Sequence, residues 1–133
     1  MQTLEPIAAS LSQRTISLVI LDSYQIMADG LSRLLGSTPG FQVLASEVAS
    51  VESATLVSRL QPALVIVDPV VEPIIIDKLL RTLSIRLNES HLVVLTEEPT
   101  DRLLEQIVQY EVSCLSKAVS SSELVDYLQR AHS

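Results

Sequence analysis

Cysteine, glycine and aromatic residues are scarce in this chain of 133 residues, which has one cysteine, three glycines, one phenylalanine and no tryptophan. The single Cys114 excludes an internal disulfide and is typical of a protein of the reducing cytoplasm. Because large aromatic residues are few, the core must be packed from leucine, valine and isoleucine. Hydrophobic residues make up 47% of the chain, which excludes a disordered protein.

Long apolar runs and an excess of positive charge are also absent. Asp68, Glu72 and Pro73 interrupt the longest candidate for a membrane span, and the N-terminus lacks the charged and then apolar pattern of a signal peptide. Nine lysine and arginine residues stand against 16 aspartate and glutamate residues, a net charge of −7. This balance argues against direct contact with nucleic acid or an anionic membrane. We therefore expect one cytoplasmic domain.

Strand and helix patterns alternate along the chain. Compact apolar runs predict strands at 16–21, 41–45, 64–67, 91–95 and 112–116, and helical spacing predicts helices that start near 24, 51, 74, 100 and 120. Such alternation, with right-handed crossovers, predicts an α/β fold with a five-stranded parallel sheet and helices on both faces. Residues 1–14 show no clear period, so we expect a flexible leader before a domain that spans 15–133.

Four of the predicted strands run directly into a polar residue, namely Asp22, Asp68, Thr96 and Lys117. Parallel strands end at the same edge of a sheet, where ligands bind in open α/β folds, so these residues should converge. Two carboxylates suit Mg²⁺, and Asp68 can attack phosphorus as a nucleophile. Lys117 can then neutralise the transferred group, and Thr96 can donate a hydrogen bond to it. Lys117 can equally form a structural salt bridge with Asp68.

Short motifs around these residues follow one another in a recognisable order. They are Asp22-Ser23-Tyr24-Gln25, Gly30–Leu35 with Pro39–Val43, Val65–Asp68, Val93–Thr96, and Leu115-Ser116-Lys117 with Glu123-Leu124 beyond it. Together they resemble the receiver domain of two-component response regulators over residues 16–131, and are most similar to receivers that precede a LuxR-type helix-turn-helix.

This resemblance implies a doubly wound, flavodoxin-like sheet with strand order 2-1-3-4-5. It implies that Asp68 accepts a phosphoryl group from a sensor histidine kinase, with Lys117 and Thr96 as site residues and Mg²⁺ held by Asp22, Asp68 and, weakly, Ser23. It also implies a signalling domain and not an enzyme. The implied output is a homodimer or partner contact through the helix that starts near 100, strand 112–116 and the last helix. The resemblance further implies control of transcription by a domain outside these residues.

Several positions depart from the family pattern. Ser23 replaces the second acid, so we expect weaker Mg²⁺ binding or none. Glu97 follows Thr96 where a small residue is usual, so it can shield Asp68. Cys114 takes the place of the aromatic residue that moves when the receiver switches. The segment 69–73 lacks the usual polar and glycine-rich character.

These departures keep an alternative open: an atypical pseudo-receiver that binds partners independently of phosphorylation. Two other classes are less favoured. A phosphatase of the haloacid-dehalogenase type needs an acid two residues after its nucleophile, where this chain has Val70, and a flavin-binding flavodoxin would not place Asp22 in its phosphate loop.

Overall fold

The computed structural model describes residues 15–50, 52–68, 77, 80–81, 91–97, 101, 104–105 and 113–132. The predicted leader 1–14 and the segment 69–73 lie outside these residues. The helices predicted from 74 and from 100 are described only at six positions, all of them helical: Asp77, Leu80, Arg81, Asp101, Leu104 and Glu105. Among the described residues, no helix is long and apolar enough to cross a membrane.

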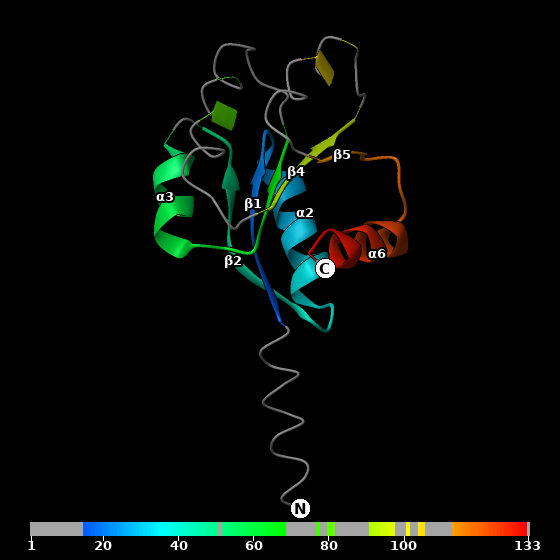
Figure 1. The fold of residues 1–133 in the computed structure, drawn as a ribbon. Coiled ribbons are helices and arrows are strands. Elements are labelled where there is room, and N and C mark those ends of the chain that lie inside the picture. Colours follow the sequence, from blue (N-terminus) through cyan, green and yellow to red (C-terminus); the bar gives the residue numbers. More distant parts are fainter. Residues whose placement is uncertain are drawn as a thin grey trace, which may run out of the picture.

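Parallel strands form one sheet in the order β2-β1-β3-β4-β5, and they all point the same way (Figure 1). The strands are β1 (Ile16–Asp22), β2 (Phe41–Val48), β3 (Leu64–Val67), β4 (His91–Thr96) and β5 (Ser113–Ser116). The sequence-based prediction of fold class and strand order is confirmed. β1 lies at the point where the order reverses, between β2 and β3, which is where open α/β sheets place their ligand sites.

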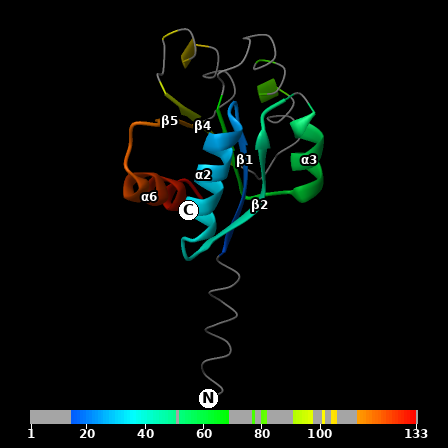
Figure 2. The ribbon, with the colours of Figure 1, turned by 180° about the vertical axis from the view of Figure 1, so that it is seen from behind.

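Helices cover both faces of the sheet (Figures 1 and 2). The helices with described bounds are α2 (Gln25–Gly36), α3 (Ser53–Leu60) and α6 (Ser121–His132). Residues of α2 and α6 belong to one hydrophobic cluster, and residues of α3 belong to another. In β1, Leu18 and Ile20 join the first cluster, whereas Val19 and Leu21 join the second. A strand buried on both faces must be apolar at successive positions, which explains the compact runs in the sequence.

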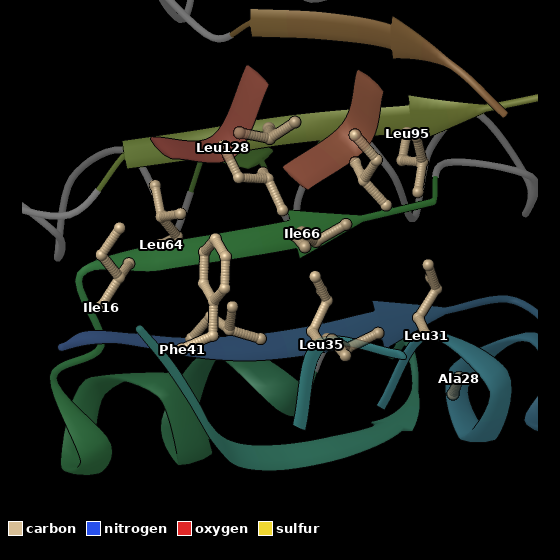
Figure 3. Packing of buried hydrophobic residues seen from close by; sticks show 13 residues of the cluster. Ile16, Ala28, Leu31, Leu35, Phe41, Leu64, Ile66, Leu95 and Leu128 are labelled. Carbon is tan, nitrogen blue, oxygen red and sulfur yellow. The ribbon is translucent and has the colours of Figure 1, made fainter. Parts of the chain in front are cut away.

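One of the two clusters lies between the sheet and helices α2 and α6 (Figure 3). Leu31 and Leu35 reach it from α2, Leu128 from α6, and Ile66 and Leu95 from the central strands. Leu35 and Leu128 are completely buried. This packing holds α2 and α6 against one face of the sheet, and so positions the loop from β1 to α2 and the connection from β5 to α6.

A local signal accounts for the start of α6. The Ser120 hydroxyl accepts a hydrogen bond from the Glu123 amide at 3.2 Å, and the Glu123 carboxylate accepts one from the Ser120 amide at 3.3 Å. This reciprocal pair is a capping box. β2 runs three residues beyond the predicted end, to Val48, because a half-exposed edge strand tolerates polar residues. Leu104, an apolar residue of the helix predicted from 100, is 42% exposed.

We predict that Leu35→Ala lowers the free energy of unfolding by about 2–5 kcal/mol, because it leaves a cavity in a completely buried site. Ile26→Ala on the same helix is the control, since Ile26 is 80% exposed and should change stability by no more than about 0.5 kcal/mol. Urea denaturation followed by circular dichroism measures both. Equal losses in the two variants would contradict the packing described here.

Candidate functional site

Main-chain hydrogen bonds join the carboxyl end of β1 to the residue after β3 on one side and to the residue after β2 on the other, and the first of them brings two aspartates to the same place. The Asp68 amide donates to the Leu21 carbonyl at 2.8 Å, and the Ala49 amide donates to the Asp22 carbonyl at 2.7 Å. On the other side, the Lys117 amide donates to the Thr96 carbonyl at 2.7 Å, which fixes the residue after β5 to the end of β4. The backbone therefore brings Asp22, Asp68, Thr96 and Lys117 to one edge of the sheet, as the sequence predicts.

Lys117 joins the two aspartates through its side chain. Its Nζ lies 2.6 Å from Asp68 Oδ2 and 2.9 Å from Asp22 Oδ2. The side chains are almost fully buried, with exposed fractions of 7% for Lys117, 2% for Asp22 and 1% for Asp68. Charge-assisted hydrogen bonds of this length are strong, and buried charges require such partners.

The two carboxylates of this cluster stabilise the positive charge of Lys117. Burial alone would lower the pKa of the Lys117 ammonium, but the hydrogen bonds to Asp68 and Asp22, together with their negative charges, outweigh burial and raise the pKa above its ordinary value of 10.5. Lys117 is therefore charged throughout the physiological pH range. With both carboxylates ionised, the three side chains sum to one negative charge, which a cation or a hydrogen-bond donor can approach.

The loop after β1 holds the aspartates from the other side. The Tyr24 amide donates to Asp22 Oδ1 at 3.0 Å, so each oxygen of the Asp22 carboxylate accepts a hydrogen bond. The half-buried Ser23 lies next to Asp68, and its hydroxyl donates to the Asp68 main-chain carbonyl at 3.4 Å. Ser23 thus lies beside the site as predicted, but it supplies a neutral oxygen. Among the described residues, no group of three or more histidine, cysteine, aspartate or glutamate side chains is arranged to hold a metal ion.

Three further residues were named from the sequence, and the structure describes the burial of each: Thr96, Glu97 and Cys114. Thr96 is buried at the end of β4, with 3% exposed, and within the described part of the chain its hydroxyl makes no hydrogen bond. Glu97 is exposed, and the hydrogen bonds and ion pairs of the described residues include none between Glu97 and Asp68. Cys114 is half-buried in β5 opposite Val94, and burial raises the pKa of its thiol.

Two interactions of the site were not predicted from the sequence. One is the second ion pair of Lys117, to Asp22, and the other is the Tyr24 amide on the Asp22 carboxylate. The convergence of strand ends could have predicted the first, because Lys117 comes directly after β5 and Asp22 ends β1 at the same edge of the sheet. The second is an Asx turn, for which an aspartate two residues before the bonded amide is the sequence signal.

Comparison with known proteins gives matches in structure alone. No protein-family profile matches the sequence, and no curated protein is similar to it. A DNA-binding response regulator of the LuxR family from Staphylococcus aureus superposes with a TM-score of 0.80 at 18% identity, over 89% of this chain and 99% of that chain. The receiver domain of the response regulator NarL from Mycobacterium tuberculosis gives 0.78 at 13% identity, over 90% of this chain and 97% of that chain.

This chain has the receiver-domain fold. A third match, the chemotaxis protein CheY4 of Vibrio cholerae, has a TM-score of 0.76 at 14% identity, over 88% of this chain and 98% of that chain. The sequence motifs predicted a likeness to receiver domains, LuxR-type receivers among them. The fold confirms this likeness. Because the sequence identities are 13–18%, these matches show the fold alone. The roles of single residues in this chain must be argued from the geometry of its own site.

We predict that Lys117→Met lowers the free energy of unfolding at pH 7 by about 3–5 kcal/mol, because it leaves two buried carboxylates without their ammonium partner. The control is Arg130→Met, which removes an exposed ion pair to Asp126 and should cost at most about 1 kcal/mol.

The pH dependence of this difference follows from the raised pKa of Lys117. The stabilisation from the ammonium is complete below pH 10.5 and is lost as the pH rises through the higher pKa of the folded state. The gap between wild type and Lys117→Met should therefore persist to pH 10 and narrow only above 10.5. A gap that closes near neutral pH would contradict the ion pairing.

Proposed function

We propose that this chain is a signalling receiver that accepts a phosphoryl group on Asp68 and passes the signal on by dimerisation or by contact with an output partner, in the control of transcription. The observation that carries the proposal is the Lys117 ammonium, 2.6 Å from the Asp68 carboxylate and 2.9 Å from Asp22 at the carboxyl edge of the sheet. The receiver-domain fold supports the proposal, since the solved structures with this fold include response regulators.

In this proposal the donor is the phosphohistidine of a sensor kinase. A carboxylate oxygen of Asp68 attacks the phosphorus, the P–O bond forms as the P–N bond breaks, and the kinase histidine leaves and takes up a proton. Lys117 moves its hydrogen bond from the Asp68 oxygen to the phosphoryl oxygens while Asp22 keeps it in place. The buried Thr96 hydroxyl can donate to the same phosphoryl group, and within the described residues no other hydrogen bond occupies it.

A magnesium ion, which the resemblance implies, fits the donor set only in part. The Asp22 and Asp68 carboxylates suit a cation that keeps most of its waters, whereas Ser23 offers a neutral oxygen where the family has an acid. The two carboxylates would hold the ion, with little help from Ser23, so we propose weak binding. When bound, the ion would supply positive charge to the transferred phosphoryl group.

A second candidate function is a pseudo-receiver that works through protein contacts alone. The observation that favours it is the burial of Asp68, whose side chain is 1% exposed and held by Lys117. In that case the ion pairs are structural and the output surface is permanently formed. For both candidates we propose that the surface that includes β5 and α6, with the helix predicted from 100, contacts the partner or a second copy of the chain.

We predict that beryllofluoride with millimolar Mg²⁺ shifts the amide NMR signals of Thr96 and Lys117, because it mimics a phosphoryl group on Asp68 and draws the Lys117 ammonium to it. Asp68→Asn is the control and should give no shift, since the amide cannot bind beryllofluoride. Identical spectra of wild type with and without the reagent, together with equal partner binding by Asp68→Asn, would contradict the phosphoacceptor function and leave the pseudo-receiver.

We further predict that Ser23→Asp tightens Mg²⁺ binding by about tenfold or more, since an additional carboxylate near the ion contributes at least about 1.4 kcal/mol. Ser37→Asp is the matched control, because Ser37 is exposed after the end of α2 and adds the same charge away from the site. Isothermal titration calorimetry measures the Kd for both. A similar gain in the two variants would mean that Ser23 does not border the metal position.

A further inference from the structure

A cavity of about 120 Å³ lies between α2 and the connection from β5 to α6. Its apolar wall is formed by side chains of α2 and of the neighbouring elements, namely Met27, Leu31, Leu34, Leu95, Val119 and Leu124. Leu31 and Leu95 belong to the core cluster and lie toward the same end of it, close to the carboxyl ends of the strands (Figure 3). The cavity is open to solvent beside Ser120 and Ser121, which are exposed, so a small molecule can enter it and displace water from the apolar wall.

The same cavity has a polar side formed by Lys117, Ser120 and Ser121. Lys117 is therefore part of the cavity wall and also the ammonium that joins Asp22 to Asp68. The Ser120 hydroxyl already caps α6. The Ser121 hydroxyl makes no hydrogen bond in the described part of the chain, so it can bind a polar group placed in the cavity.

Size and charge define the ligand. The cavity approaches the roughly 150 Å³ of an engineered apolar cavity that binds benzene, which suits a body of about six non-hydrogen atoms and is too small for a helix or strand. Lys117 is the one charged residue in the cavity wall, and its ammonium is already paired with two carboxylates, so the wall offers no unpaired cation to an anionic ligand. The serine hydroxyls favour one hydroxyl or carbonyl group on an otherwise apolar molecule.

We propose that this cavity is a binding site for a small neutral molecule with an apolar body and a single hydroxyl or carbonyl group, and that its occupancy is felt at Lys117. The site lies beyond the phosphoacceptor function and does not depend on it. Because a ligand in contact with the Lys117 side chain changes the position of its ammonium, the molecule acts on the ion pairs whether or not Asp68 is phosphorylated.

The test uses phenol, benzene and benzoate as probes, titrated into the whole chain and followed by the NMR signals of the leucine methyl groups and of the Lys117 side chain. We expect saturable phenol binding with a Kd of about 1 mM or below, shifts at Leu31, Leu124 and Lys117, and no saturation by benzoate. Benzene should bind about fivefold more weakly than phenol, because it lacks the hydroxyl.

Matched variants locate the binding. Leu34→Phe fills the cavity and should weaken phenol binding at least about tenfold, since the added volume competes with the ligand. Leu60→Phe is the control, because Leu60 is also partly buried but packs on the opposite face of the sheet. It should leave phenol binding unchanged.

Circular dichroism shows whether Leu34→Phe folds. If it does not, Ser121→Ala provides the test instead. It should remove most of the advantage of phenol over benzene without disturbing the core, since Ser121 is exposed. Absence of saturation by phenol, equal binding of benzoate, or shifts that leave Lys117 unmoved would overturn the proposal. Failure of beryllofluoride to bind would contradict the phosphoacceptor function but not the cavity as a binding site, so the two proposals are tested separately.

Discussion

A buried ammonium group placed between two buried carboxylates is the interaction on which the carboxyl edge of this sheet depends. Lys117, Asp22 and Asp68 come from the ends of three different strands, and each has less than a tenth of its side chain exposed. Removing any one of them from water without the others would be costly. The cluster therefore requires the strand order that brings β1 and β3 together, and it requires the β5 connection to pass over the end of β4.

The same interaction limits what the site can do. Lys117 already occupies an oxygen of each carboxylate, so a phosphoryl group must take over one of these hydrogen bonds to be held. Ser23 contributes no charge, which makes the ammonium the principal cation of the site. If Asp68 accepts a phosphoryl group as proposed, the buried Thr96 hydroxyl, which makes no hydrogen bond among the described residues, can donate one to it. The cavity beside Lys117 adds a way to influence the same ammonium from its other side.

Sequence alone predicted much of this arrangement, for physical reasons that differ from element to element. The bounds of β3 were predicted correctly because Leu64–Val67 is buried on both faces and so is apolar throughout. β2 was predicted too short, since an edge strand with half-exposed residues resembles a loop after Ala45. Leu104 is apolar and yet 42% exposed, because apolar character alone does not show which side of a helix meets the sheet. The pairing of Lys117 with Asp22 depends on strand order and side-chain length, which periodicity does not encode.

The most direct test of the account is an NMR titration of the Lys117 side chain, in which the ¹⁵N shift of Nζ is followed with pH. If the ammonium lies between the two carboxylates, the Lys117 pKa is higher than the ordinary value of 10.5 and the signal does not titrate below that pH. A Lys117 pKa at or below 10.5 would show that burial outweighs the ion pairs and would contradict the bridged cluster.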